Sequence, residues 1–190
     1  ELGCPPQRHR RAGRMNPSGV AVFYGAFDLD TCVAELRPGV GSTVIGAKFE
    51  LIRPVCVIDT TRFSEPGKEL SLFAKDHMRR VAQWTFMRRF MDEIARPVSP
   101  SDEHLDYIPT QAVAEYLANH YEFHLKGKAM RIEAIIYRSA QYPTGKNIAL
   151  LGGAAHMEMP EAASRGRSST DILDEFLPET MANFQAGRSA

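Results

Sequence analysis

The sequence has no excess of charge of either sign, because its 190 residues include 23 Lys and Arg and 23 Asp and Glu. A protein that neutralises rows of phosphates usually concentrates surplus Lys and Arg on one face. The balanced charge therefore argues against nucleic-acid binding as the main role. With 44% hydrophobic and 24% charged residues, the chain has the composition of a globular protein with a buried core rather than of a disordered one.

Cysteine and long apolar runs are also scarce. Cys4, Cys32 and Cys56 are odd in number and widely spaced, so we expect a reducing compartment and no disulfide framework. No run approaches the ~20 apolar residues that cross a bilayer, and the N-terminus lacks a basic-then-apolar signal. The sequence therefore predicts a soluble protein. Because the chain begins without Met, it leaves open an upstream region that the sequence does not include.

Sequence signatures of metal and cofactor sites are missing too. Gly152-Gly153 lacks the third glycine of a dinucleotide-binding loop. The six histidines are scattered, without an H-E-x-x-H motif or a paired Cys and His spacing. We therefore expect neither a bound metal nor a Rossmann-type nucleotide site.

The expected elements run from strands through helices and back to strands. This order favours an α+β fold over a strictly alternating α/β fold. Apolar and β-branched runs predict strands at 20–24, 42–52, 55–59, 132–139 and 147–151. Apolar residues at threes and fours, together with capping residues, predict helices at 31–36, after Thr110 as N-cap and near 170–177, and one long helix or two in succession at 69–95.

Four short segments combine polar residues with apolar surroundings. In chain order they are Gly-Arg-Met-Asn at 13–16 leading into 23–26, Ala-Glu at 34–35, Thr-Gln-Ala-Val-Ala-Glu at 110–115, and Ile-Ile-Tyr-Arg-Ser at 135–139. Together they resemble the RES domain, a bacterial family named for an arginine, a glutamate and a serine. The resemblance covers about residues 12–151. Four motifs in the same order are much more specific than any one of them.

The resemblance implies a mixed-sheet core similar to that of the diphtheria-toxin-like ADP-ribosyltransferases, and an activity that consumes NAD. It implies a catalytic domain over residues 1–160, with an insertion at about 62–106 that contains the long helix, and a C-terminal tail at 161–190. The insertion could serve as a lid, a dimer contact or a docking surface. Where family members carry Asp-Gly before the last apolar strands, this chain has Glu133-Ala134, so we expect the path towards Ser139 to differ slightly.

Members of the family are typically toxins that an antitoxin neutralises. The implied partners are therefore NAD as substrate and an antitoxin or immunity protein, with no nucleic acid, membrane, metal or further cofactor; a homodimer stays open. The implied place of action is the cytoplasm, and delivery into a target cell stays open. Three functions remain. They are an antibacterial NAD glycohydrolase, an enzyme that transfers ADP-ribose to phosphate or protein, and a catalytically silent module whose 69–95 helix binds a partner.

Carried over position by position, the implied site is Arg14, Tyr24, Glu35, Gln111 and Ser139. The bond between nicotinamide and ribose breaks with positive charge on the ribose, so the Glu35 carboxylate can stabilise the transition state. One carboxylate is enough because nicotinamide leaves as a neutral base. Arg14 offers a charged fork for the pyrophosphate, and Tyr24 offers a ring for the nicotinamide.

Ser139 is expected to donate a hydrogen bond to Glu35 or to a ribose hydroxyl. We assign it a positioning role, since no histidine base neighbours it in the matched segments. Taken singly, each residue also has an ordinary structural explanation: Arg14 as a solvated loop residue, Tyr24 as a core aromatic, Glu35 as an exposed helix end, Gln111 as a first-turn residue and Ser139 as a turn former. Their order in the chain favours the site.

Overall fold

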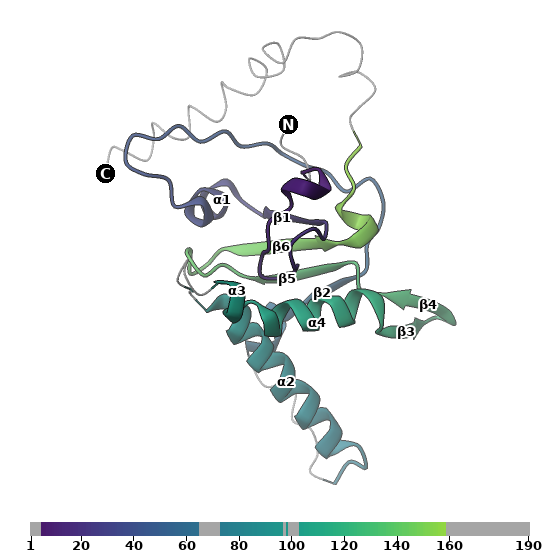
Figure 1. The fold of residues 1–190 in the computed structure, drawn as a ribbon. Coiled ribbons are helices and arrows are strands. Elements are labelled where there is room, and N and C mark those ends of the chain that lie inside the picture. Colours follow the sequence, from purple (N-terminus) through teal and green to yellow (C-terminus); the bar gives the residue numbers. More distant parts are fainter. Residues whose placement is uncertain (1–4, 65–72, 97, 99–102, 159–190) are drawn as a thin grey trace. The chain divides into compact units, whose positions relative to one another are not determined.

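The computed structural model describes residues 5–64, 73–96, 98 and 103–158, and Figure 1 shows the course of the chain. The chain divides into two compact units, Glu1–His156 and Met157–Ala190. The first unit combines a mixed sheet with helices, which confirms the α+β fold class. The helix expected near 170–177 lies outside the described residues. No described helix is long and apolar enough to cross a membrane.

A four-stranded sheet in the order β1-β6-β5-β2 forms the centre of the first unit. β1 pairs antiparallel with β6, β6 pairs antiparallel with β5, and β2 runs parallel to β5. The predicted strands at 20–24, 55–59, 132–139 and 147–151 are confirmed, with ends displaced by up to two residues. The observed strands are Val22–Ala26 (β1), Val57–Asp59 (β2), Ala134–Arg138 (β5) and Lys146–Leu151 (β6).

The register of these strands decides which side chains share a face. Tyr24 lies opposite Ala149 in β6, and Asn147 of β6 lies opposite Tyr137 in β5. Because alternate residues of a strand point to the same side, these side chains and Ser139, just beyond β5, face the same way. This face of the sheet carries both the hydrophobic core and the polar residues that matter below.

Two helices cover that face. His77–Ala95 (α2) and Ile108–Asn119 (α4) pack apolar side chains on the strands, and Glu103–Asp106 (α3) lies between them in the chain. The core consists of one cluster of apolar side chains from the helices, the sheet and the N-terminal loop: Met15, Phe90, Ile94, Ala114, Leu117, Ile132, Ile135, Tyr137, Ala149 and Leu151. Burying these side chains supplies the main driving force for this packing.

The helix predicted over 69–95 begins later than expected. Residues 69–72 lie outside the described residues, 73–76 form turns, and α2 starts at His77. Its buried residues, Phe90, Met91 and Ile94, all lie in the last turns. The first half of α2 therefore extends beyond the sheet, as Figure 1 shows.

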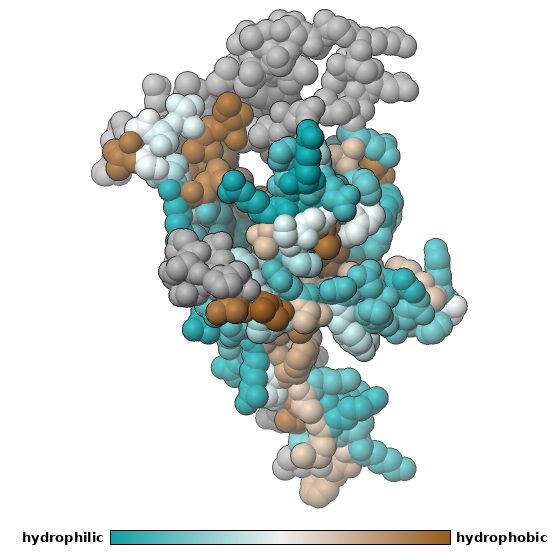
Figure 2. Space-filling model, in the orientation of Figure 1, coloured by the Kyte–Doolittle hydropathy of each residue, from teal (hydrophilic) through white to brown (hydrophobic). Residues whose placement is uncertain are grey.

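The strand predicted over 42–52 is wrong, because this stretch is irregular and joins no sheet. Its alternating apolar residues favour an extended backbone, but a strand also needs a partner along its whole length. The Phe49 ring instead packs against Phe23 in β1 in an edge-to-face arrangement, with centroids 4.9 Å apart. Val40 and Ile45 stay exposed, as does Leu36 at the end of the helix Leu29–Leu36 (α1). Figure 2 shows a hydrophobic region over this segment and α1.

Thr110 is not the N-cap of α4. The helix begins at Ile108 after Tyr107, so Pro109 occupies its first turn. Proline has no N–H to donate, and the first turn needs none, so a helix tolerates it there. The Thr110 hydroxyl is used elsewhere, as a donor to the carbonyl oxygens of Arg14 and Tyr107 at 2.5 and 3.0 Å.

A hairpin of Glu122–Leu125 (β3) and Lys128–Arg131 (β4) forms a second, two-stranded sheet that the sequence pattern did not predict. Its two-residue loop places Lys126 and Gly127 at φ of 51° and 77°. Such turns usually contain Asn-Gly or Asp-Gly, and Lys-Gly is a weaker signal. Short 3-10 helices complete the described unit at Gln7–His9 (η1), Thr60–Ser64 (η2) and Gly152–Ala155 (η3).

Candidate active site

The Gly-Arg-Met-Asn motif forms a tight turn that α4 holds in place. Gly13 and Asn16 exchange backbone hydrogen bonds of 2.9 and 3.3 Å, which puts Arg14 and Met15 at the corner. The Met15 side chain is 3% exposed and anchors the turn in the core. From α4, the Gln111 Nε2 donates to the carbonyl oxygens of Gly13 and Asn16 at 2.8 and 3.0 Å. The geometry favours a positioning role for Gln111, whose contact with NAD stays a prediction.

Tyr24 of β1 closes against the same turn. Its hydroxyl donates to Asn16 Oδ1 at 2.7 Å and accepts from the Met15 N–H at 2.9 Å. A Cβ at Gly13 would lie 2.7 Å from this hydroxyl oxygen, so the motif needs glycine at that position. Burial of the hydroxyl raises the pKa of Tyr24 well above its ordinary value, although 40% of the residue remains exposed. The hydroxyl is therefore a fixed donor, and the exposed remainder of the side chain is accessible to a ligand.

The Arg14 side chain leaves the turn towards the start of α4. Its guanidinium carbon lies 5.2 Å from the centre of the Tyr107 ring, which is the geometry of a cation–π contact. Tyr107 directly precedes α4. The aromatic ring therefore orients a partly buried guanidinium whose charge is permanent.

Glu35 lies in the last turn of α1 (Leu29–Leu36), which follows β1 and begins with Asp28 as N-cap. The Ser139 hydroxyl donates to Glu35 Oε1 at 2.6 Å, and the Asn147 Nδ2 donates to the same oxygen at 2.7 Å. From the described residues, Oε2 receives no hydrogen bond. Ser139 and Asn147 are 8% and 4% exposed, whereas Glu35 itself is exposed. The carboxylate is therefore held from the protein side and open on the other.

Ser139 has a hydroxyl with all its hydrogen-bonding capacity in use. The oxygen accepts from the backbone N–H groups of Gln141 and Tyr142 at 3.1 and 2.9 Å, while its proton points to Glu35. A serine with one donor and two acceptor sites is then satisfied. The hydrogen bond to Glu35, one of the two expected from the sequence, is present. The arrangement suits a positioning group rather than a nucleophile.

The turn between β5 and β6 also fixes α1. Thr31, fully buried, donates its hydroxyl to Asp28 Oδ2 at 2.8 Å. Gly145 lies so close to the Thr31 side chain that a Cβ at this position would collide with it. Glycine is therefore required for α1 to approach the turn. This approach brings Glu35 within reach of Ser139 and Asn147.

Tyr137 of β5 lies near several of these groups. Burial raises the pKa of its hydroxyl, the nearby Tyr24 and Glu35 raise it further, and Arg14 opposes them. These side chains therefore all lie within electrostatic reach of one buried hydroxyl. The structure brings together Arg14, Tyr24, Glu35 and Ser139, with Gln111 behind the Arg14 turn.

No sequence pattern predicted a role for Asn147, Tyr137 or Tyr107. Asn147 could have been noticed as a polar residue on the inward face of a strand that continues with Ala149 and Leu151. Tyr137 lies inside the Ile-Ile-Tyr-Arg-Ser segment, but nothing in the residue type distinguishes it from a core aromatic. Tyr107 precedes a proline-containing helix start, and no sequence pattern links it to Arg14.

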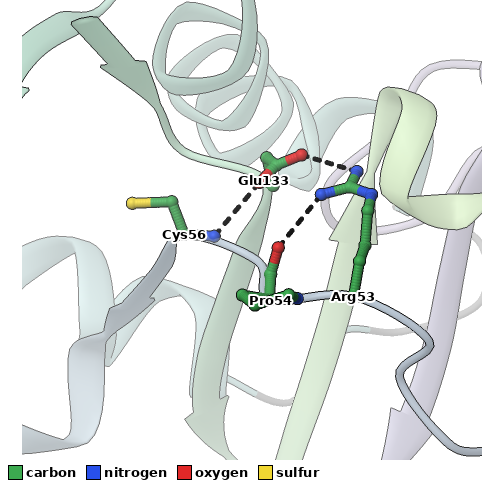
Figure 3. Close-up of polar contacts among 4 residues, drawn as sticks. All are labelled: Arg53, Pro54, Cys56 and Glu133. Atoms are coloured by element: carbon green, nitrogen blue, oxygen red, sulfur yellow. Dashed lines mark hydrogen bonds and ion pairs between the residues drawn. The ribbon is translucent and has the colours of Figure 1, made fainter. Parts of the chain in front are cut away.

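A second carboxylate, Glu133, is held quite differently at the start of β5 (Figure 3). Its Oε1 pairs with the Arg53 guanidinium at 2.7 Å, and its Oε2 accepts from the Cys56 N–H at 3.2 Å. The hydrogen bond from Arg53 lowers the pKa of Glu133, against the opposing effect of burial. Burial and the charge of Glu133 raise the pKa of the Cys56 thiol. The contacts of Glu133 therefore link the residues that lead into β2 to those that lead into β5.

The chain matches the RES domain over residues 4–171. This range covers most of the chain and contains the whole of the site described above. No curated protein and no solved structure matches the chain, so the likeness to ADP-ribosyltransferases stays a prediction. The chain belongs to the RES domain family, which is linked to toxin–antitoxin systems that act on NAD.

Proposed function

We propose that this protein is a toxin that hydrolyses the bond between nicotinamide and ribose in NAD, giving nicotinamide and ADP-ribose. The observation that carries the proposal is the Glu35 carboxylate, which Ser139 and Asn147 hold at Oε1 and leave open at Oε2. Membership of the RES domain family, which is linked to systems that act on NAD, supports NAD as the substrate. We propose no metal and no further cofactor for the reaction.

The arrangement of the site suits this chemistry. As the bond to nicotinamide breaks, positive charge develops on the ribose, and a fixed carboxylate stabilises it. Nicotinamide leaves as a neutral base, so no acid is needed to protonate it. Water then adds to the anomeric carbon and releases one proton, which completes the hydrolysis.

Arg14 and Tyr24 would bind the two ends of the reacting part of NAD. The guanidinium of Arg14, oriented by the Tyr107 ring, suits the anionic pyrophosphate. Tyr24 keeps its hydroxyl in the turn while part of its side chain is exposed to a flat nicotinamide. A site with one positive and one negative group matches a substrate that has an anionic pyrophosphate and a cationic reacting centre.

The deciding experiment measures nicotinamide released from NAD by the purified protein, in buffers with and without phosphate. We expect release in both, with ADP-ribose as the second product. Glu35→Gln should remove most of the activity, whereas Glu115→Gln, which changes an exposed carboxylate on α4, should leave it unchanged. Absence of nicotinamide release from the wild-type protein in every buffer would overturn the proposal.

The alternatives give different products. An enzyme that transfers ADP-ribose to phosphate forms ADP-ribose 1-phosphate only when phosphate is present. An enzyme that modifies a protein transfers the label of adenine-labelled NAD to that protein.

A silent partner-binding module predicts that Arg14→Ala and Glu35→Ala change nothing in cells. For a toxin, we expect the wild-type gene to lower cellular NAD and growth and the Glu35→Gln gene to do neither.

A further inference from the structure

Asn147 is a buried polar residue at the beginning of β6. It is 4% exposed and lies opposite Ala26 on one side and Tyr137 on the other. A buried amide needs hydrogen-bond partners, because leaving its donors without any has a large desolvation cost. The described partner of its Nδ2 is Glu35 Oε1, 2.7 Å away and 112 positions distant in the chain.

The contact determines how a mobile side chain is held. Glu35 stands at the exposed end of a helix, where a glutamate normally samples several rotamers. Asn147 from β6 and Ser139 from the end of β5 both donate to one oxygen of this carboxylate. Two donors on Oε1 restrict rotation of the side chain and leave Oε2 for the substrate.

The two donors are not equivalent. The Ser139 oxygen also accepts from the N–H groups of Gln141 and Tyr142, so it shapes the turn between the strands. The Asn147 Nδ2 has no such second task among the described residues. Replacing Asn147 therefore changes the hold on Glu35 with less disturbance of the turn.

We propose that Asn147 is a positioning residue that holds Glu35 in its reactive orientation, an inference that rests on the proposed hydrolysis of NAD. Asn147 acts through Glu35 and does not contact the breaking bond. Its removal should lower kcat and change KM for NAD much less, since the ground-state contacts of Arg14 and Tyr24 remain. A hydrogen bond to a charged group of this kind corresponds to roughly a tenfold to hundredfold change in kcat.

Asn147→Asp gives the sharpest test because aspartate has nearly the same shape as asparagine. Ionised, it puts a second negative charge against Glu35 Oε1 and should inactivate the enzyme. Protonated, its O–H can donate to Oε1 as the amide did. We therefore expect this variant to regain activity as the pH falls, so that its pH–rate profile shifts to more acidic pH. Asn147→Ala should be slow at every pH, with a profile of wild-type shape.

Matched controls separate this role from a structural one. Asn119→Asp makes the same chemical change on the exposed end of α4 and should leave the pH–rate profile unshifted. In the background of Glu35→Gln, Asn147→Ala should cause little further loss, because both changes affect one contact. Thermal melts show which variants fold; if Asn147→Ala does not, Asn147→Asp carries the test.

The outcomes distinguish the two proposals. If the wild-type protein releases nicotinamide while kcat is unchanged in Asn147→Ala and the profile of Asn147→Asp is not shifted, the role of Asn147 is overturned and the hydrolysis stands. If the wild-type protein releases no nicotinamide, the proposed function is overturned and this inference with it.

Discussion

Glu35 and Glu133 lie at opposite ends of β5, and the protein holds the two carboxylates in different ways. Glu133 uses both oxygens, one on the Arg53 guanidinium and one on the Cys56 N–H. Glu35 accepts from two neutral donors on a single oxygen, and no described Lys or Arg forms an ion pair with it. One carboxylate is paired with a cation, whereas the second oxygen of the other accepts no hydrogen bond from the described residues.

This difference indicates which carboxylate can stabilise a developing positive charge. An ion-paired glutamate has little charge left for a substrate, whereas one held by neutral donors presents its full charge in a fixed position. Residue type alone does not separate them, since each is a glutamate beside apolar residues. The partners supplied by neighbouring elements assign Glu133 to the fold and favour Glu35 for the chemistry.

The largest expected effect follows directly from that contrast. Glu35→Gln keeps the shape of the side chain and removes its charge, so we expect kcat for nicotinamide release to fall by roughly 10²- to 10³-fold. Glu133→Gln makes the same change at the other end of β5 and should leave kcat close to the wild-type value. Equal losses of kcat in the two variants would break the distinction between the two glutamates.

Arg14 should affect binding more than the chemical step. We expect Arg14→Ala to raise KM for NAD by roughly tenfold to hundredfold, because a charged contact to the pyrophosphate is lost. Arg11→Ala removes an exposed arginine of the same loop and serves as the control in steady-state assays. A normal KM for Arg14→Ala would exclude this arginine from substrate binding.

The turn that carries Arg14 can be tested through Gly13. A Cβ there would lie 2.7 Å from the Tyr24 hydroxyl oxygen and 2.9 Å from Asn16 Oδ1. We expect Gly13→Ala to reduce the free energy of unfolding by about 1–3 kcal/mol, as overpacking does, and to lower activity as well. Gly153→Ala places a methyl group in open space and should be neutral in the same urea titrations.

The smallest effect concerns the pH dependence of stability. The pKa of Glu133 is lowered by Arg53 from its ordinary value of 4.5, so the folded state prefers the ionised form. This stabilisation is present above about pH 4.5 and is lost as the pH falls through the lower, folded-state pKa. Glu133→Gln should therefore make the unfolding free energy less sensitive to acid. Because the pair is partly exposed, the difference should be small; an unchanged acid sensitivity would contradict it.

The grouping of the candidate site residues could be predicted from the sequence because these residues lie in short segments with a recognisable order. Arg14, Tyr24, Glu35 and Ser139 come together as that order implied, and the hydrogen bond between Ser139 and Glu35 is present. Asn147 was missed because its contact joins β6 to α1 across 112 positions. A local pattern carries no information about such a pair.

The predicted strand at 42–52 failed for a related reason. Alternating apolar residues report a local preference for extended backbone, but the sheet accepts a strand only where an edge is free and the register fits. The later start of α2 and the placement of Thr110 inside α4 are smaller errors of the same kind. In each of these segments the local signal was real, and contacts with distant residues decided the outcome.

From its sequence alone, this protein is an α+β domain with the four ordered motifs of the RES family, since composition, periodicity and motif order are local properties of the chain. The tertiary structure decided what those motifs do to one another. It placed one glutamate against an arginine and the other against a serine and an asparagine. Charge is neutralised or kept according to what packs beside it, and only the folded chain determines those neighbours.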